Sequence, residues 1–467
     1  MTNSNQEVSA GPTKRFFVEM LTRDIELEDA ILDLLDNCVD GVLRQRKGKS
    51  KKAKNPYSGY FAKITATPTK FVIEDNCGGI PLDIARKSAF MLGRPDERDS
   101  TIETVGMYGI GMKRAIFKMG RKCVVTSQPT ASTTYQVTIA PSWFKQDQEW
   151  TLPLKKTTDR LDENGTKIEV SNLLDVMKTK FNEEKSNFIE DLKDRISELF
   201  ARIIANGFEV YVNGELIEPV NLDLLAPSKV TRGRKTIAPF LFQGTVKGVT
   251  VELVVGFHRG LASESEMDVE SKASRKHAGW TIVCNDRIVV YANKTRLTGW
   301  GTAGVPAYHN QFIAIRGLVV FRSKKSFLLP INTTKRGLDT SSEVYLLVLD
   351  VMRDGMKQFT DYTNRWKSRN EETVVDFEKL EKKSASEIIA SVPKTEWKNV
   401  RKGPDVKAKK YIPSLPVPKQ ESQKRRIQFS KKITDIQRVA TYLSEEDASP
   451  SEVGEKCFDE ILNEATS

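Results

Sequence analysis

The fold is decided by one stretch near the start of the chain, Glu28-Asp29-Ala30-Ile31-Leu32-Asp33-Leu34-Leu35-Asp36-Asn37-Cys38-Val39-Asp40. Apolar residues recur there at three- and four-residue spacing, which predicts one buried stripe of an amphipathic helix. They are Leu27, Ile31, Leu34, Leu35, Cys38 and Val42. A second face, also at helical spacing, carries Asp33, Asn37, Asp40 and Arg44. A solvated helix face is the plainest interpretation of these polar residues. Whether they form a functional site instead depends on the segments downstream.

Three later segments combine apolar runs with glycine turns. Val72-Ile73-Glu74-Asp75-Asn76-Cys77-Gly78-Gly79-Ile80 is an apolar run that ends in an acid and a glycine turn. Gly106-Met107-Tyr108-Gly109-Ile110-Gly111-Met112-Lys113 opens a helix-compatible stretch, and Asn164-Gly165-Thr166-Lys167 precedes a strand-like run. In this order the four pieces resemble the nucleotide-binding motifs of the GHKL ATPases, the family of gyrase B, Hsp90, histidine kinases and MutL, whose fold is called the Bergerat fold.

The resemblance implies a site for ATP and Mg²⁺. Asn37 would give its amide oxygen to Mg²⁺, which prefers oxygen ligands. Asp33, one helical turn earlier, would direct a water at the γ-phosphate as the general base. Asp75 matches the acid that binds the adenine amino group, with Thr166 beside it, and the glycine-rich segment would bring main-chain N–H groups to phosphate. The other implied nucleotide contacts are Asp40, Gly79, Ile80, Gly106, Gly109, Gly111, Met112 and Lys113.

Two positions depart from the family pattern. Asp33 stands where the family usually has glutamate, which is one methylene longer, and this bears on hydrolysis more than on binding. Cys77 replaces the first glycine of the turn after Asp75 and reduces the backbone freedom there. Taken singly, each element has a plainer interpretation: a turn acid at Asp75, a structural glycine turn, and a strand-start threonine at Thr166.

The chain has 467 residues, which is too long for one ordinary core. The resemblance implies the fold class α+β, with a Bergerat-type ATPase α/β sandwich and an S5-like transducer domain, and a small helical C-terminal tail is expected after them. The predicted parts are a flexible tail at 1–14, the ATP-binding domain at 15–222, the transducer-like domain at 223–366, a charged helix and basic proline-containing linker at 367–432, and a helical hairpin at 433–467.

Hydrophobic patterning predicts the elements of the first two domains. In the first, strands are expected at 60–66, 70–74, 122–127, 134–139, 150–154, 167–170 and 209–212, and helices at 81–90 and 181–204. Residues 93–105 are polar and charged, which suggests a mobile lid. In the second, strands are expected at 248–257, 279–284, 287–292 and 312–321, followed by a helix at 341–366.

The second domain resembles the transducer that follows the ATPase in gyrase B, MutL and MORC proteins. In those relatives a loop of this domain sends a lysine to the γ-phosphate, where a cation stabilises the charge in transfer. Lys335, in the loop from Ile331 to Gly337, is the predicted residue and has a catalytic role in this interpretation. An exposed loop lysine is its plainer alternative.

Charge and cysteine content bear on the expected partners and location of the protein. The chain has a net charge of +11, and two segments, 44–54 and 393–432, carry a net +7 and +10, so the rest is net acidic. Flexible basic segments commonly contact phosphate backbones, although solubility alone also explains them. The five cysteines are scattered and unpaired in spacing, which favours reduced thiols and a cytoplasmic location. The sequence has neither a long apolar run nor an apolar leader, so no membrane association is expected.

The resemblance to the GHKL ATPases implies a Mg²⁺-dependent ATPase that acts as an ATP-gated dimeric clamp. By analogy with MutL and MORC proteins, DNA is the expected client, in defence against mobile DNA or in repair, and the C-terminal tail is expected to bind other proteins of a multi-subunit system. An Hsp90-like chaperone and a nucleotide-gated scaffold with little hydrolysis are the alternatives. Salt-dependent DNA binding with and without an ATP analogue discriminates among them.

Overall fold

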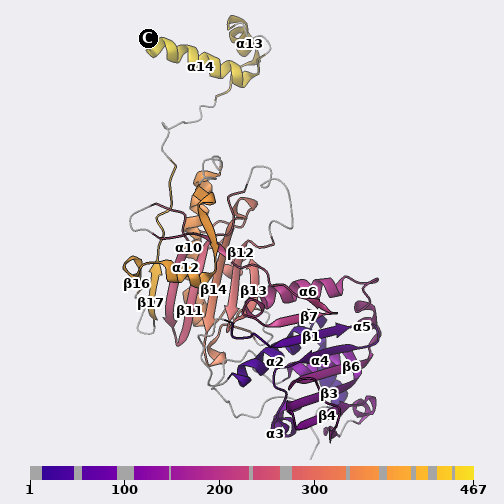
Figure 1. Ribbon diagram of the computed structural model, residues 1–467. Helices are drawn as coiled ribbons and strands as arrows, with labels where there is room; N and C mark the ends of the chain where they lie inside the picture. Colours follow the sequence, from indigo (N-terminus) through magenta and orange to yellow (C-terminus); the bar gives the residue numbers. More distant parts are fainter. Residues whose placement is uncertain are drawn as a thin grey trace, which may run out of the picture. The chain divides into compact units, whose positions relative to one another are not determined.

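The computed structural model describes residues 13–46, 55–91, 110–146, 149–230, 235–262, 276–332, 337–367, 376–400, 406–418, 429–443 and 448–466. The chain divides into two compact units, Met1–Val417 and Pro418–Ser467. The first unit holds two large β-sheets with helices packed on them (Figure 1). None of the helices in the described ranges is both long and apolar enough to cross a membrane.

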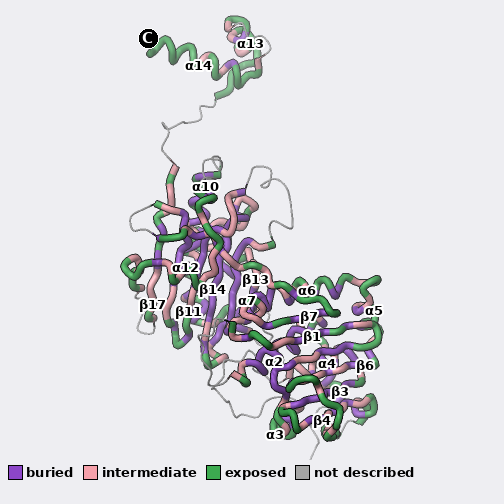
Figure 2. Tube along the Cα trace, viewed as in Figure 1, coloured by how far each residue is buried: buried purple, intermediate pink, exposed green. Residues whose placement is uncertain are grey.

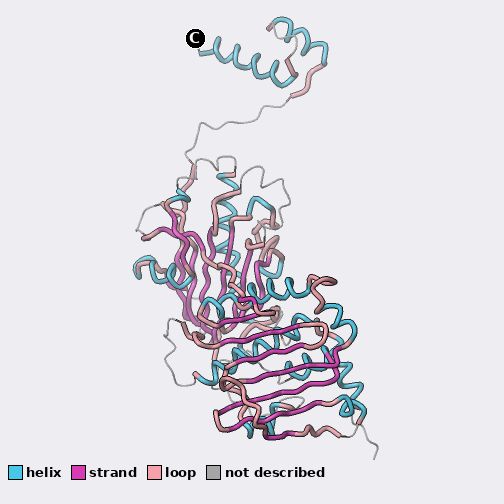
Figure 3. The backbone as a smooth tube through the Cα atoms, turned by 45° about the vertical axis from the view of Figure 1, so that its right-hand side comes forward, coloured by secondary structure: helices cyan, strands magenta, loops and turns pink. Residues whose placement is uncertain are grey.

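The first sheet has eight strands in the order β5-β4-β3-β6-β2-β1-β7-β8 (Figure 3). β1 and β7 run parallel, and the other neighbouring pairs are antiparallel. The strands are β1 (Phe61–Ala66), β2 (Phe71–Asp75), β3 (Gly120–Thr130), β4 (Thr133–Ile139), β5 (Leu154–Lys156), β6 (Thr166–Leu173), β7 (Glu209–Val212) and β8 (Glu215–Leu216). The seven strands predicted in this region all overlap observed ones, although β5 begins only at Leu154.

Helix α2 (Leu27–Gln45) lies in the core beneath this sheet and contacts α4 (Gly111–Met119). The six residues of its predicted apolar stripe are all buried, with at most 5% of their surface exposed. Complete burial of such a side chain contributes about 1.5–3 kcal/mol. The predicted helix and its buried apolar stripe are therefore confirmed, and the polar residues lie outside that stripe.

The other helices of this region are short. α1 (Lys14–Arg23) precedes α2, and α3 (Leu82–Ile84) runs into a π-helical turn at Ala85–Ala89, inside the predicted helix 81–90. The predicted helix at 181–204 is wrong in its extent, because the chain forms α5 (Asp175–Lys180), α6 (Phe188–Leu199) and α7 (Ala201–Ala205). The side chains of Asn182 and Ser186 accept hydrogen bonds from main-chain N–H groups two residues ahead and so favour turns before α6.

The end of the predicted flexible tail is part of the fold. Lys14 begins α1 and is fully buried. Its ammonium donates to the carbonyl oxygens of Trp143 at 2.7 Å and Gln146 at 2.6 Å, and also to that of Glu149. It lies 3.9 Å from the centre of the Trp143 ring. The tail prediction is therefore wrong at its last residues, since these carbonyl groups offset the cost of burying the charge. Residues 1–12 lie outside the described part.

The second sheet has seven strands in the order β13-β12-β14-β11-β10-β17-β16. β12 and β14 run parallel, and the other pairs are antiparallel. Helix α10 (Glu343–Trp366) packs on β10, β11 and β14 around a second hydrophobic core (Figure 2). The strands are β10 (Phe240–Val246), β11 (Val249–Phe257), β12 (Gly279–Cys284), β13 (Arg287–Asn293), β14 (Ile315–Arg322), β16 (Lys398–Val400) and β17 (Val406–Tyr411).

Much of the charged helix and basic linker predicted at 367–432 is instead folded into this second region, and its charged part includes a strand and a short helix rather than one continuous helix. β17 pairs with β10 along its whole length and β16 pairs with β17, while β15 (Leu380–Lys383) pairs with β9 (Leu224–Pro227). Helix α12 (Ala385–Ser391) buries Ile388 and begins with a capping box. The linker prediction failed because β16 is an edge strand, where lysine is common, and because the charge of β17 concealed the alternation of Val406 and Ala408 with lysines.

The second unit, considered by itself, contains α13 (Ile433–Tyr442) and α14 (Pro450–Thr466), which lie within the predicted hairpin at 433–467. They contact one another, and each buries one small apolar residue, Ala440 in α13 and Val453 in α14. Ser449 and Glu452 cap the start of α14 reciprocally, the arrangement expected from the sequence Ser-Pro-Ser-Glu.

Candidate ATP site

The polar residues of α2 differ in their exposure to solvent. Asp33, Asp36 and Asp40 are buried, with 7%, 2% and 4% of their surface exposed, whereas Asn37 is exposed. The side chain of Asn37 makes no hydrogen bond to any residue in the described ranges. Its amide oxygen is thus available to a ligand, and amide oxygen suits Mg²⁺. Across the described residues no three His, Cys, Asp or Glu side chains converge on one point. A magnesium ion held by Asn37 together with phosphate oxygens fits this donor set.

Asp33 contacts the start of α4. Its Oδ2 accepts a hydrogen bond from the guanidinium of Arg114 at 2.8 Å, and both side chains are largely buried. A Cβ atom built on Gly111 would lie 3.2 Å from the same carboxylate oxygen. Gly111 therefore lets the first turn of α4 approach Asp33 closely. Arg114 was not singled out from the sequence, although it follows the glycine-rich segment directly.

The N-terminus of α4 carries main-chain N–H groups without a side-chain cap from any described residue. Such a terminus attracts anions because its N–H groups are unsatisfied and the helix dipole is positive there. Met112 is half-buried in this first turn, and Lys113 is buried with its ammonium donating to the carbonyl of Ala89 at 2.9 Å. Gly106, Gly109 and the predicted lid at 93–105 lie outside the described residues, as does Lys335.

Asp75 stands at the end of β2, where Thr166 of β6 is its direct partner in the sheet. The main-chain N–H of Cys77 donates to one carboxylate oxygen of Asp75 at 2.7 Å, and the thiol of Cys38 on α2 donates to the other at 3.5 Å. The register thus brings together the two residues that were predicted to contact adenine, and α2 lies beside them.

Glycines shape the turn after Asp75. Gly78 and Gly79 have φ values of +92° and +64°, in the left-handed region that favours glycine. A Cβ atom on Gly165 would lie 1.7 Å from the carbonyl oxygen of Asp75, so no other residue fits there. Cys77, which replaces a glycine of the family pattern, does not have a positive φ. A side chain is therefore tolerated at this position.

Ile80 completes the turn through its main chain. Its N–H donates to the hydroxyl of Ser127 at 2.7 Å, and its carbonyl accepts from the hydroxyl of Tyr135 at 2.7 Å. These two side chains come from β3 and β4 and attach the turn to the sheet. Neither Ser127 nor Tyr135 was predicted as part of the site, because nothing local in the sequence marks a residue that holds a turn in another segment.

Burial raises the pKa of Asp75 from its ordinary value to about 6. The main-chain N–H groups of Cys77 and Thr166 and the Cys38 thiol favour the ionised form and oppose this shift. Burial also raises the pKa of the Cys38 thiol well above its usual range, and the negative charge of Asp75 adds to the effect. The carboxyl group of Asp75 is therefore ionised at neutral pH and gains its proton in mildly acidic solution.

Residues 25–172 match the family model described as histidine kinase-, DNA gyrase B-, and HSP90-like ATPase. The matched range contains α2, the end of β2, the first turn of α4 and the start of β6, which are the elements that form the site. No curated protein matches the chain. Residues 25–172 are therefore similar to the ATPase domains of the GHKL superfamily.

Proposed function

We propose that this chain binds one Mg²⁺-bound ATP in the site between α2, α4 and the ends of β2 and β6, and hydrolyses it. The convergence of Asn37, Gly111 and the Asp75–Thr166 pair supports this assignment most directly. Asp75 accepts a hydrogen bond from the adenine amino group, the first turn of α4 binds phosphate, and Asn37 binds Mg²⁺. The bound metal supplies charge neutralisation at the phosphates.

Asp33 is the proposed general base, because it lies one helical turn before Asn37 and beside the phosphate-binding end of α4. Lys335 is the proposed cation from the second domain, in the loop between Ile331 and Leu338, which pair with each other. The ion pair of Asp33 with Arg114 favours a second candidate function, a nucleotide-gated scaffold with little hydrolysis. A carboxylate oxygen already bound to a guanidinium is less free to orient water.

The affinity for ATP is expected to fall in mildly acidic solution. A protonated Asp75 loses acceptor capacity, so affinity should decrease about tenfold between pH 7 and pH 5 for a group whose pKa is about 6. Fluorescence titration at each pH measures this. Asp75→Asn is the control, because it removes this titration and keeps the titration of the nucleotide phosphates. An identical pH dependence in the wild type and the variant would contradict the prediction.

Loss of folding does not explain that expected decrease. The carboxyl group of an unfolded chain titrates near 3.9, whereas Asp75 in the folded protein titrates at about 6. Between these values the folded state binds more protons than the unfolded state, so Asp75 contributes stability that grows as the pH falls through 6 and is lost as it rises. The unfolding temperature measured at each pH tests whether the stability that Asp75 contributes increases as the pH falls.

We further propose that ATP drives two chains to dimerise as a clamp and that DNA is the client, on the analogy with MutL and MORC proteins. The two basic segments, 44–54 and 393–432, support DNA as the client. The concentration of positive charge in these segments is a stronger indication of phosphate binding than the net charge of the chain. Within the second segment, Lys398 of the edge strand β16 and Lys407 of the neighbouring strand β17 are exposed.

Salt-dependent binding to duplex DNA tests this client, with and without a non-hydrolysable ATP analogue. We expect binding that the analogue strengthens and that weakens with salt, and we expect Lys398→Gln with Lys407→Gln to lower the salt slope by about 0.9 per lost phosphate contact. Lys185→Gln, an exposed lysine outside both segments, should leave the slope unchanged. Binding that is insensitive to both salt and nucleotide would contradict a DNA clamp.

A further inference from the structure

The turn between β12 and β13 inserts a short polar tip against the ATPase domain. Its two central residues, Asn285 and Asp286, have φ values of +48° and +70°, as a tight hairpin requires. The Asn285 amide is bonded to the main chain of Ser323 in both directions, at 2.9 and 3.0 Å. The second sheet therefore holds the tip in one conformation.

Arg287, at the start of β13, carries the main contact. Its Nε donates to Asp36 of α2 at 2.8 Å, and both side chains are almost completely buried, with 4% and 2% of their surface exposed. Nη1 donates to the carbonyl of Leu199 at 3.0 Å. The guanidinium also lies 4.0 Å from the centre of the Phe200 ring. This one arginine therefore joins the second sheet to α2 and to the end of α6.

Asp286 forms a second connection beside the first. It accepts from Arg322 of its own sheet at 2.8 Å and pairs with Arg202 of α7 at 3.5 Å. The hydroxyl of Tyr57, which precedes β1, donates to it at 3.4 Å. Although burial raises the pKa of Asp286, the two arginines outweigh that effect and hold it below its ordinary value. Asp286 is therefore charged and anchored in the folded protein.

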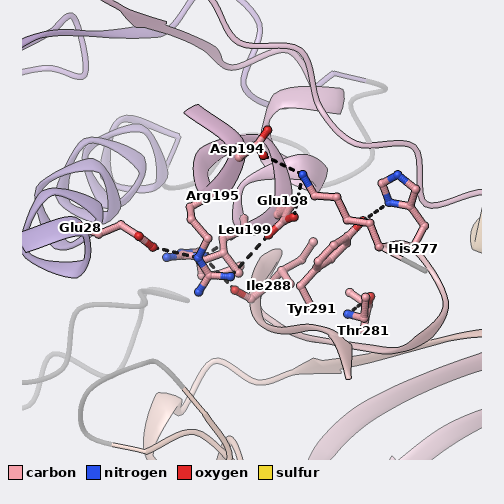
Figure 4. Close-up of polar contacts among 12 residues, drawn as sticks. Glu28, Asp194, Arg195, Glu198, Leu199, His277, Thr281, Ile288 and Tyr291 are labelled. Atoms are coloured by element: carbon pink, nitrogen blue, oxygen red, sulfur yellow. Dashed lines mark hydrogen bonds and ion pairs between the residues drawn. The ribbon is translucent and has the colours of Figure 1, made fainter. Parts of the chain in front are cut away.

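The contacts continue outward along α6. Figure 4 shows Arg195 of α6 bonded to Glu28 at the start of α2 and close to Glu198. Lys276, just before β12, pairs with Asp194 and Glu198, at 2.8 and 3.5 Å. These outer ion pairs are partly exposed to solvent, so they contribute little to stability and are weakened by salt.

We propose that Arg287 is a positioning residue for ATP hydrolysis, which acts through Asp36 to orient α2. Asp36 immediately precedes Asn37, the proposed magnesium ligand, and lies within one turn of Asp33. A small rotation of α2 would displace both groups, and displacements of about 1 Å are enough to lower rates about a hundredfold. The second sheet thus takes part in forming the nucleotide site through this hairpin. The proposal rests on the assignment of Asn37 and Asp33 above.

The test must separate positioning from stability. Removing only one partner leaves a buried charge and strongly destabilises a protein, whereas replacing both partners with apolar residues of similar volume is often neutral. The main variant is therefore Asp36→Leu with Arg287→Met in the full chain, and Arg287→Lys is a second variant that keeps the charge but loses the guanidinium fork. Lys276→Gln, which removes an exposed ion pair across the same boundary, is the matched control.

Three quantities are measured for each folded variant: the Kd for ATP by calorimetry, the Mg²⁺ concentration that half-saturates binding, and kcat. In the double variant we expect kcat to fall by about tenfold or more and the required Mg²⁺ to rise, with the Kd at saturating Mg²⁺ within about threefold of the wild type. Arg287→Lys should shift kcat and Mg²⁺ in the same direction by less, and Lys276→Gln should leave all three unchanged.

A kcat and a Mg²⁺ requirement equal to those of the wild type in either Arg287 variant would overturn the proposal, and so would equal losses in Lys276→Gln. If the double variant does not fold, Arg287→Lys decides the matter by the same criteria. A wild-type chain that neither binds nor hydrolyses ATP would instead refute the proposed function. The two failures are therefore distinguishable.

Discussion

Asp75→Ala is expected to lose most of the affinity for ATP. Asp75 is the half-buried acceptor opposite Thr166 at the end of β2, and hydrogen bonds to charged groups contribute about 1.5–3 kcal/mol, so binding should weaken about ten- to hundredfold. The adenine ring then binds without the hydrogen bond that its amino group donates to Asp75. Titration calorimetry with Mg²⁺-ATP measures the change.

Glu74→Ala is the matched control for this variant. Glu74 is the adjacent residue of β2, and its side chain pairs with Lys167 on the sheet surface at 3.4 Å. It should bind ATP as the wild type does. If Asp75→Ala retains wild-type affinity while folded, adenine is not recognised here, and the assignment of this end of the site is wrong.

Asp33→Asn is expected to bind ATP with little change in affinity and to hydrolyse it at least about a hundredfold more slowly, the usual contribution of a general base. Asparagine keeps the shape and can still accept from Arg114, so the start of α4 should stay in place. Release of inorganic phosphate under single-turnover conditions measures the rate.

Glu26→Gln serves as the control for Asp33→Asn, because Glu26 is exposed at the start of the same helix and makes no capping hydrogen bond there. Hydrolysis at the same measurable rate in the wild type and Asp33→Asn would remove Asp33 as the base. If neither chain hydrolyses ATP while both bind it tightly, the scaffold becomes the better description of the chain.

The parts of the site that the sequence predicted are those formed within one element or between neighbouring strands. The spacing of Leu27 to Val42 predicts the buried apolar stripe of α2 and the polar face with Asn37, but not that Asp33 and Asp40 on that face are buried as well. The pairing of Asp75 with Thr166 was expected through the resemblance to known ATPases, and the sheet register now provides its geometry.

The parts that were not predicted depend on pairs of residues far apart in the chain. Arg114 lies 81 residues from Asp33, and Arg287 lies 251 residues from Asp36. No periodicity within a segment carries information about such a partner, because the contact exists only after two elements have packed. Strands β16 and β17 were missed for a different reason, since their lysines and flanking prolines are also typical of an extended linker.

The most direct test of the account is calorimetric titration of the full chain with ATP in the presence of Mg²⁺. The account predicts heat from a single site per chain, weaker binding when Mg²⁺ is chelated, and loss of most of the affinity in Asp75→Ala. A folded chain that shows no heat of ATP binding with Mg²⁺ present, by a method able to detect weak binding, would contradict it.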